Sequence, residues 1–543
     1  MKKYLPYILY LILATVVMLP FFSSGFLFLI DMTWTPNIQL ADYLTNGISS
    51  HFPITFIFKA LNLIVSLDVL QKALLLVILF ISGSLMYWLA KRYMRSELAW
   101  TAGLFYMFNP FVYERFLAGQ WIVLLGYAYF PLVLGLFLVF LKKPKSKNFY
   151  KFCIALVLYP IVSPHWFYIA IPFLILTGAV HLWREKKWSV LGIKIFWQRT
   201  IELVLAFLVV NSFWLFSFWR GDGTFSRITL NDFQAFKTLG DDQFGIYYNV
   251  LSLYGFWSTS KFLPKDLFSS WWIWTIFFAG LSLLGAWQIL KQKKLIGLVL
   301  VIAFLPTLIL AVGYGSDFSR WINDVLFYIM PGFKGFRDTE KLVGLLAFTY
   351  ALFIPLGTKY FLELCGLEFK KRFLSLANLL AVSIVVGLVF LATFGIFDSF
   401  NQELKTYEYP AGWNVVEEKL ATNPNAETML FLPWHGYPSL DFAGYEKIAN
   451  PARRFFSVPV VAGRSFDNRY IVETIQVEWN TYIDQLVVGD RNLDDQIDFL
   501  RNRDISHIVL AKVHDFEEYE FLGQSQMLIR EYEDDDIVLY RIK

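Results

Sequence analysis

Hydrophobic runs of helix length recur along most of this 543-residue chain. A helix needs about 20 predominantly apolar residues to cross a bilayer, and about eleven stretches meet or approach that length. Charged residues make up only 17% of the chain, against roughly 25% in soluble globular proteins. The sequence therefore predicts a polytopic α-helical membrane protein. The expected spans are 4–23, 69–90, 97–110, 121–141, 149–163, 165–183, 199–219, 270–290, 295–313, 341–360 and 374–396.

Clusters of lysine and arginine follow alternate spans, and they all agree with the basic N-terminus. An excess of these residues marks the cytoplasmic side of a membrane. We therefore expect an integral protein of the inner or plasma membrane with a cytoplasmic N-terminus and long outer loops at 24–68 and 220–269. The basic clusters lie at 2–3, 91–95, 142–147, 184–187, 291–294 and 370–372.

Residues 397–543 differ in composition from the rest of the chain. They contain 26 acidic and 14 basic residues, a net charge of −12, so the remainder of a chain with net charge +4 carries +16. This asymmetry predicts a membrane domain at 1–396 and an extracytoplasmic α/β domain at 397–543. An acidic soluble part argues against nucleic acid as a partner. Apolar patterning predicts helices at 410–420 and 492–502, strands at 429–432 and 505–511, and a hairpin at 527–542.

The first outer loop carries two acidic residues, Asp31 and Asp42. Eleven residues make about three helical turns, so both carboxylates share a face if the segment is helical. A short surface helix is expected there, because Ala41, Leu44 and Ile48 follow an amphipathic spacing. A lone acid in a loop is more often solvated than functional, so position alone does not assign Asp31 a role.

The next outer segment places Glu114 and Arg115 among aromatic residues near the membrane surface. Charges are costly at that depth unless they are paired or functional, so an interfacial ion pair and a functional site are equally open. His165 lies in a tight outer turn beside Trp166, where a histidine is more often structural than catalytic.

A third outer loop ends with Lys334, Arg337 and Lys341, which are spaced three and four residues apart. A phosphate or a lipid headgroup would explain positive charge on the outer face. A helix start, with Asp338 as its cap and Lys341 in an ion pair, explains the same residues. In the acidic tail, His435 lies in a loop directly after the expected strand at 429–432, which is a common ligand position in α/β folds.

These features together resemble the type-C (GT-C) integral-membrane glycosyltransferases. That superfamily has many spans, an acidic residue in the first outer loop, further acidic residues after the third span and often an outer α/β domain. The stretches 109–121 and 333–338 look like large bacterial membrane proteins related to mycobacterial arabinofuranosyltransferases. The resemblance implies inverting transfer of a sugar from a polyprenyl-phosphate donor lipid to a glycan or lipid-linked acceptor of the cell envelope.

The resemblance also implies roles for individual residues. Asp31 matches the acid of the first loop and would be the general base for an acceptor hydroxyl. Glu114 matches the second acidic position and would orient the acceptor or a metal, while Arg337 would neutralise the leaving phosphate. The second position here is Glu-Arg rather than a pair of acids, so Mg²⁺ or Mn²⁺ and a metal-independent reaction both stay open.

Two other classes of protein fit the same sequence. A transporter or lipid flippase would also have many spans, but it would keep ionisable groups at mid-membrane, and the expected spans are nearly free of charge. A non-catalytic scaffold for envelope assembly would use the outer domain equally well. Walker loops, G-x-S-x-G, H-E-x-x-H and paired C-x-x-C motifs are all missing from the sequence.

Overall fold

The computed structural model folds into two compact units, which are described separately below. The first unit comprises Met1–Pro20, Ser49–Ile54 and Leu74–Leu404, and the second comprises Phe21–Ile48, Thr55–Ala73 and Lys405–Lys543. The structure describes residues 4–40, 48–185, 190–219, 228–258, 261–367, 376–463, 474–488, 492–513 and 515–543.

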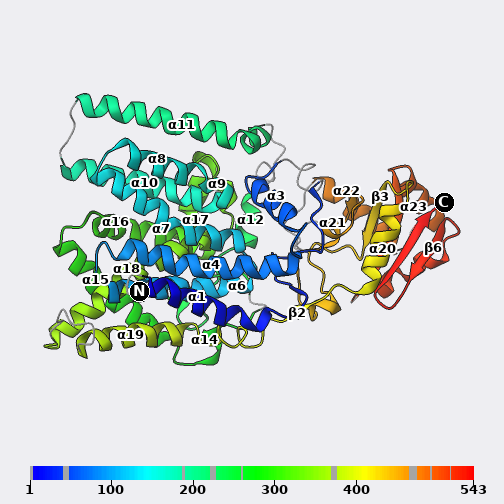
Figure 1. Ribbon diagram of the computed structural model, residues 1–543. Coiled ribbons are helices and arrows are strands. Elements are labelled where there is room, and N and C mark those ends of the chain that lie inside the picture. Colours follow the sequence, from blue (N-terminus) through cyan, green and yellow to red (C-terminus); the bar gives the residue numbers. More distant parts are fainter. Residues whose placement is uncertain are drawn as a thin grey trace. The chain divides into compact units, whose positions relative to one another are not determined.

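Each stretch that the sequence predicted as a span is largely helical (Figure 1). Among the described residues, seven helices are long and apolar enough to cross a membrane, and three shorter apolar helices accompany them. A total of about eleven spans stays a prediction. The helices are α1 (Leu5–Met18), α4 (Leu67–Ala90), α5 (Ser96–Met107), α7 (Trp121–Lys142), α8 (Ser146–Val157), α9 (Tyr159–Val162), α10 (Pro164–Glu185), α11 (Val190–Trp219), α15 (Trp272–Lys291), α16 (Leu295–Val312), α18 (Val343–Leu364) and α19 (Leu376–Ala392).

Helix α18 is the centre of the first unit, since it is buried along almost its whole length. It packs closely against α15 because both helices place glycines at the contact. An added Cβ at Gly285 of α15 would lie 2.0 Å from the backbone oxygen of Phe353, and one at Gly357 of α18 would lie 1.8 Å from that of Leu281. Small residues of this kind allow helix backbones to approach closely in a membrane.

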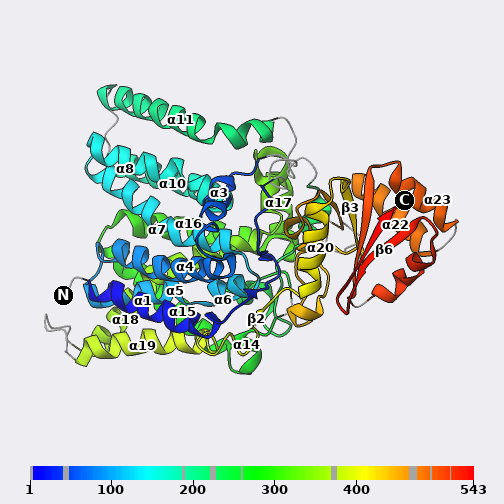
Figure 2. The ribbon, with the colours of Figure 1, turned by 45° about the vertical axis from the view of Figure 1, so that its right-hand side comes forward.

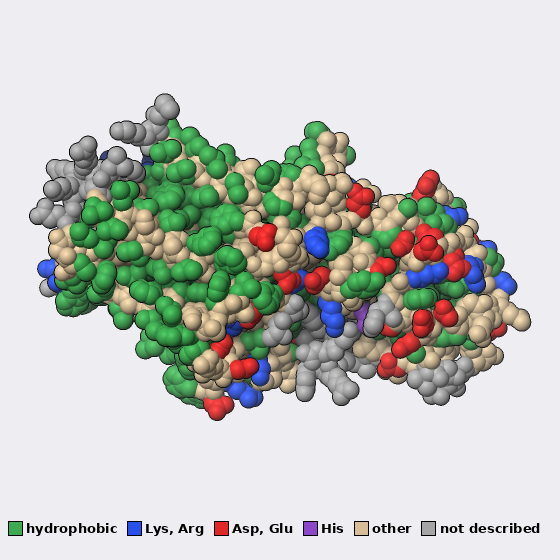
Figure 3. All heavy atoms as spheres, turned by 90° about the horizontal axis from the view of Figure 1, so that it is seen from below, with side chains coloured by type: hydrophobic (Ala, Val, Ile, Leu, Met, Phe, Trp, Pro, Cys, Tyr) green, Lys and Arg blue, Asp and Glu red, His purple; other side chains and the backbone are tan. Residues whose placement is uncertain are grey.

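Apolar side chains cover the outside of the helical unit. On the face shown in Figure 3, the helices present mainly hydrophobic side chains. Helix α11 lies at the edge of the helical unit in Figures 1 and 2, and Ile201, Leu205 and Val209 on it are exposed. Because an uncharged apolar surface of this extent is unfavourable in water, the unit belongs in a bilayer. The protein is an integral membrane protein.

Short helices fill the connections between the long helices of the first unit. Most of them belong to the segments that the sequence predicted as outer loops. They are α6 (Pro110–Leu117), α12 (Leu230–Ala235), α13 (Gly245–Leu251), α14 (Pro264–Leu267), α17 (Asp317–Ile329) and the 3-10 turns η3 (Gly313–Gly315), η4 (Phe333–Phe336) and η5 (Thr339–Leu342).

The second unit contains a five-stranded sheet in the order β4-β3-β5-β7-β6. Strands β4, β3 and β5 are parallel, and β7 pairs antiparallel with β5 and with β6. The expected strands, hairpin and flanking helices are all present. The elements are β3 (Thr428–Leu432), β4 (Val460–Val461), β5 (Ile505–Ala511), β6 (Leu528–Glu533), β7 (Ile537–Ile542), α20 (Ala411–Thr422), η6 (Asp441–Ala443), α21 (Ala452–Phe455), α22 (Thr474–Val488), α23 (Leu493–Arg501) and η7 (Phe516–Gln524).

Alternate side chains of β3 enter two hydrophobic cores. Met429 and Phe431 join a core built with Trp413 of α20. Leu430 and Leu432 join a second core on the opposite face. A strand that is buried on both faces reads as an unbroken apolar run, which is why this strand was recognisable in the sequence.

The 3-10 turn η1 (Leu19–Phe21) follows the first helix, and the second unit begins at its last residue, Phe21. Strand β1 (Phe26–Leu27) pairs antiparallel with β2 (Thr406–Tyr407). The side-chain amide of Gln71 accepts a hydrogen bond from the Leu27 nitrogen at 2.9 Å and donates one to the Leu27 oxygen at 2.8 Å. The helix α3 (Phe52–Leu61) follows. The helix expected over Ala41 and Leu44, and with it Asp42, lies outside the described residues.

The glycine contact between α15 and α18 gives a first prediction. Gly285→Ala should destabilise the protein by about 1–3 kcal/mol, because the added methyl group meets a backbone oxygen that cannot move aside. Gly280→Ala on the same helix is the matched control, since nothing lies within 4 Å of its added Cβ. Thermal unfolding in detergent should show a lower midpoint for Gly285→Ala alone. Equal midpoints for the two variants would contradict the close contact.

Candidate functional site

Helix α6 carries two of the predicted site residues and is buried throughout. Asn109 caps its first turn, with its side-chain oxygen accepting from the Val112 nitrogen at 3.2 Å, and Pro110 occupies the first turn. Proline at that position loses no hydrogen bond, since the first amide of a helix has no partner in the helix. The Asn-Pro pair that ends α5 thus also starts α6, and it turns Glu114 and Arg115 into the interior.

Glu114 is buried and is held by backbone amides. Its carboxylate oxygens accept hydrogen bonds from the nitrogens of Gly255 and Phe256, each at 3.3 Å. Burial raises the pKa of Glu114 to about 7, although the positive charges of Arg115 and Lys265 and the two amide hydrogen bonds act in the opposite direction. The side chain therefore holds the 255–256 segment and titrates near neutral pH.

Arg115 forms a buried ion pair with Glu340. Its guanidinium lies 3.3 Å from Oε1 of Glu340, with the two side chains only 1% and 0% exposed. It also donates to Oε1 of Gln120 at 2.7 Å and lies over the ring of Phe256. Within the described part of the chain, Nε of Arg115 and Oε2 of Glu340 have no hydrogen-bond partner. The pair joins α6 to η5 and leaves two buried polar atoms available to a ligand or water.

The segment before α18 holds the three predicted cations, and each has a different environment. Lys341 pairs with Asp338 at 2.5 Å, and both are buried. Arg337 lies 3.9 Å from Asp232 and over the ring of Phe236, with its side chain 34% exposed. Lys334 lies over the ring of Phe327. Two 3-10 turns form this segment, and the Asp338–Lys341 pair agrees with the structural alternative for Lys341.

His165 is close to this same segment. Its ring meets that of Phe336 edge to face at 6.0 Å, and Lys341, Asp338 and Arg337 act on it electrostatically. Burial alone would raise the pKa of Asp338, but Lys341, His165 and Arg337 together lower it. The segment 333–341 therefore reaches both His165 and, through Glu340, Arg115. Three residues singled out from different parts of the sequence, namely Arg115, His165 and Arg337, are linked through it in the first unit.

In the second unit, backbone hydrogen bonds fix the chain on both sides of Asp31. The Ile30 oxygen accepts from the Ala449 nitrogen at 2.8 Å, and the Trp34 oxygen accepts from the Tyr409 hydroxyl at 3.1 Å. The Tyr437 hydroxyl donates to Oδ1 of Asp31 at 3.2 Å. Residues of the C-terminal region thus position a carboxylate that lies about 400 residues earlier in the chain. Tyr437 could not be recognised as a site residue from its position in the chain, because only the fold brings it to Asp31.

The same loop carries His435, at the carboxyl edge of the parallel strands. Its Nε2 lies 2.5 Å from Oδ2 of Asp515, which follows β5. Trp434 donates from Nε1 to Oδ1 of Asn480 at 2.7 Å, and its ring lies near that of Trp479. Loops after adjacent parallel strands meet at one edge of a sheet, and ligands of open α/β folds bind there. The sequence indicated His435 but not Asp515.

The predicted residues fall into two groups. Glu114, Arg115, His165, Lys334 and Arg337 belong to the first unit, whereas Asp31 and His435 belong to the second. A cavity shared by Asp31, Glu114 and Arg337 stays a prediction. No group of three or more His, Cys, Asp or Glu side chains that could hold a metal occurs among the described residues. Asp241, an acid in the loop 220–269, accepts hydrogen bonds from the nitrogens of Gln243 and Phe244.

Comparison with known proteins supports the fold. No family model and no curated protein matches the chain. Among solved structures, the arabinofuranosyltransferase AftD from Mycobacteria matches 99% of this chain with a TM-score of 0.60 at 12% identity. A mutant form of AftD matches with a TM-score of 0.61 at 13% identity over 100% of this chain. This chain covers 40% and 41% of those two chains.

A more distant match is an oligosaccharyltransferase from Archaeoglobus fulgidus, with a TM-score of 0.43 at 10% identity, covering 93% of this chain and 63% of that one. The resemblance to type-C membrane glycosyltransferases that the sequence predicted is confirmed at the level of the fold.

The buried ion pair gives a second prediction. Arg115→Met should destabilise the protein by about 3–5 kcal/mol, because it leaves the Glu340 carboxylate buried without its cation. The double variant Arg115→Met/Glu340→Met should recover much of that loss, since no unpaired charge remains. Unfolding in detergent across this double-mutant cycle measures the coupling between the two residues. Additive losses would show that the pair is not coupled.

The raised pKa of Glu114 gives a third prediction. The ordinary value of 4.5 applies to the unfolded chain and the value of about 7 to the folded one. Between these values the folded state binds the proton more tightly, so the contribution of Glu114 to the free energy of unfolding falls as the pH rises. Glu114→Gln should flatten the decline in thermal midpoint between these two pH values. An unchanged pH dependence in the variant would show that Glu114 does not titrate in this window.

Proposed function

We propose that this protein is a membrane glycosyltransferase that moves a sugar from a polyprenyl-phosphate donor lipid to a glycan or lipid-linked acceptor outside the cytoplasm. The observation that carries the proposal is a fold similar to that of a type-C glycosyltransferase together with Asp31, an acid in the loop after the first helix whose carboxylate accepts a hydrogen bond from a tyrosine hydroxyl. The similarity of the fold to AftD, an arabinofuranosyltransferase, supports sugar transfer as the class of reaction.

The proposed reaction is a single displacement with inversion. Asp31 removes the proton from an acceptor hydroxyl, whose oxygen attacks the anomeric carbon of the donor sugar. The bond between that carbon and the phosphate oxygen breaks, and its electron pair leaves with the polyprenyl phosphate. The hydrogen bond from Tyr437 supports this role, because it fixes one carboxylate oxygen and so orients the other.

Arg337 is the proposed partner of the leaving phosphate. Its guanidinium is one-third exposed, and its ion-pair distance of 3.9 Å to Asp232 is too long for a direct hydrogen bond. A phosphate that takes up this guanidinium gains charge-assisted hydrogen bonds as negative charge develops on it. Lys334 on the neighbouring turn and His165 against Phe336 are proposed to line the same donor site.

The remaining residues have positioning or acceptor roles in this proposal. Glu114 and Arg115 position neighbouring segments: Glu114 holds the 255–256 segment, and Arg115 holds Glu340. His435 and Trp434, at the edge of the sheet, would bind the acceptor glycan through hydrogen bonds and ring stacking. Asp42 belongs to the same outer loop as Asp31 and is the reserve candidate for the base.

Substitution of the proposed base gives a fourth prediction. Asp31→Asn should fold and insert normally but lose about 10²–10⁴ in the rate of sugar transfer, because an amide cannot accept the acceptor proton. The measurement is release of polyprenyl phosphate from labelled polyprenyl-phosphate sugar by the purified full chain in nanodiscs, with and without added Mg²⁺ or Mn²⁺. Tyr437→Phe keeps the carboxylate and should lose less than Asp31→Asn.

Asp535→Asn is the matched control, because Asp535 is an exposed acid in the turn between β6 and β7 of the same unit. It should keep full activity. Full activity of Asp31→Asn would place the base elsewhere, with Asp42 and Glu114 as the next candidates. Failure of the unmutated protein to consume any donor lipid would instead favour a lipid transporter or an assembly scaffold.

A further inference from the structure

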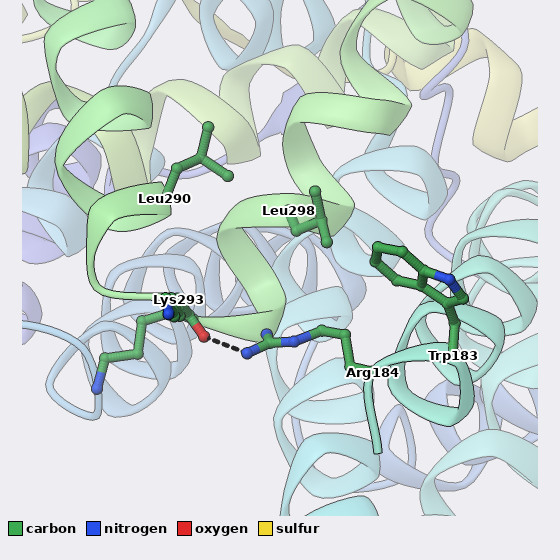
Figure 4. Close-up of a pocket in the computed structure, with 6 residues that line it drawn as sticks. Trp183, Arg184, Leu290, Lys293 and Leu298 are labelled. Carbon is green, nitrogen blue, oxygen red and sulfur yellow. Dashed lines mark hydrogen bonds between the residues drawn. The ribbon is translucent and has the colours of Figure 1, made fainter. Parts of the chain in front are cut away.

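A pocket of about 460 Å³ opens among three of the long apolar helices, and none of its lining residues belongs to the candidate site. Trp183 and Arg184 come from the end of α10, Leu290 from the end of α15, and Leu298 from the first turns of α16. The turn between α15 and α16 supplies Lys293 and Lys294. Figure 4 shows the Trp183 ring turned toward Leu298 and the Arg184 side chain extended toward the turn.

The position of the pocket along the helices places it at a membrane boundary. Helices α10 and α15 end at Glu185 and Lys291, and α16 begins at Leu295. All three are candidate spans. Exposed tryptophan and basic residues at span ends are typical of the interface between hydrocarbon and water, and Trp183 is 70% exposed. The positive-inside rule assigns this boundary to the cytoplasmic side.

One cation at the pocket is held in place by the backbone. Arg184 donates from Nη2 to the Lys293 oxygen at 2.6 Å. Lys293 has a φ of +52°, a left-handed conformation that ends α15 and turns its carbonyl toward Arg184. The Lys293 ammonium itself points away from the pocket (Figure 4). The guanidinium keeps further N–H donors, and Lys294 adds a second cation, whereas none of the six lining residues is acidic.

We propose that this pocket binds an anionic phospholipid of the cytoplasmic leaflet. The lipid phosphate accepts charge-assisted hydrogen bonds from Arg184 and Lys294. The part of the acyl chains nearest the headgroup packs on Leu290, Leu298 and the Trp183 ring. Basic pockets between spans on the cytoplasmic side recognise lipid headgroups in this way. The site is independent of the proposed sugar transfer, because it contains no residue of that site.

The experiment titrates the purified, delipidated full chain with dioleoyl phosphatidylglycerol or dioleoyl phosphatidylcholine and counts bound lipids by native mass spectrometry. We expect the anionic lipid to bind about tenfold more tightly than the zwitterionic one, since one charge-assisted contact is worth roughly that factor. Arg184→Gln/Lys294→Gln should remove this preference. Lys294→Glu, which reverses one charge, should remove it independently.

Lys142→Gln/Lys143→Gln is the matched control, since it removes two exposed charges at the end of α7 and keeps the pocket intact. It should keep the preference for the anionic lipid. Retention of the preference in both pocket variants, or an equal loss in the control, overturns the proposal. Thermal stabilisation by inorganic phosphate alone, as strong as that by the lipid, would also overturn it, because the apolar part of the pocket would then contribute nothing.

Discussion

The ion pair between Arg115 and Glu340 is the interaction on which the candidate site of the first unit depends. Two charges removed from water are costly, and their mutual attraction offsets that cost only when the geometry is good. The pair fixes α6 against η5, and η5 directly continues the segment that carries Arg337 and contacts His165. The order of this segment therefore follows from one buried contact between residues 225 positions apart.

The buried charged groups of the first unit lie in the short helices and turns between the long helices. Glu114, Asp232 and Asp338 are all buried there, and each lies near a cation or accepts backbone hydrogen bonds. The long helices, in contrast, contact each other through apolar and small residues such as Gly285 and Gly357. This separation is expected when ionised groups are too costly for the hydrocarbon but are needed at its surface.

In the second unit, hydrogen bonds from several segments hold the loop that carries the Asp31 carboxylate. Strand β1 pairs with β2, Gln71 holds Leu27, and the loop after β3 supplies Tyr437 to Asp31. The same loop holds His435 against Asp515 at the edge of the sheet. These hydrogen bonds restrict the conformations of Asp31, the proposed base, and so favour the orientation that can react.

The sequence by itself determined which segments are helices or strands and which class of fold they build. Helices at the predicted spans and strands such as 429–432 and 505–511 follow from long or unbroken apolar runs, whose burial does not depend on a particular partner. The resemblance to the type-C fold rested on the layout of these runs together with the stretches 109–121 and 333–338, and the fold is similar to that of AftD. Single residues such as Glu114, Arg115 and His165 stood out because charge beside aromatic residues is unusual.

Only the tertiary structure decided which of these residues meet. Glu340, Tyr437 and Asp515 are ordinary residues in the sequence, and they became part of the candidate sites because of contacts made across 225, 406 and 80 positions. The two 3-10 turns at 333–342, which place Lys334, Arg337 and Lys341 in three different environments, likewise came only from the folded chain. Burial of apolar surface is nearly independent of direction, so a linear pattern records it, whereas hydrogen bonds and ion pairs depend on partners that only the folded chain brings together.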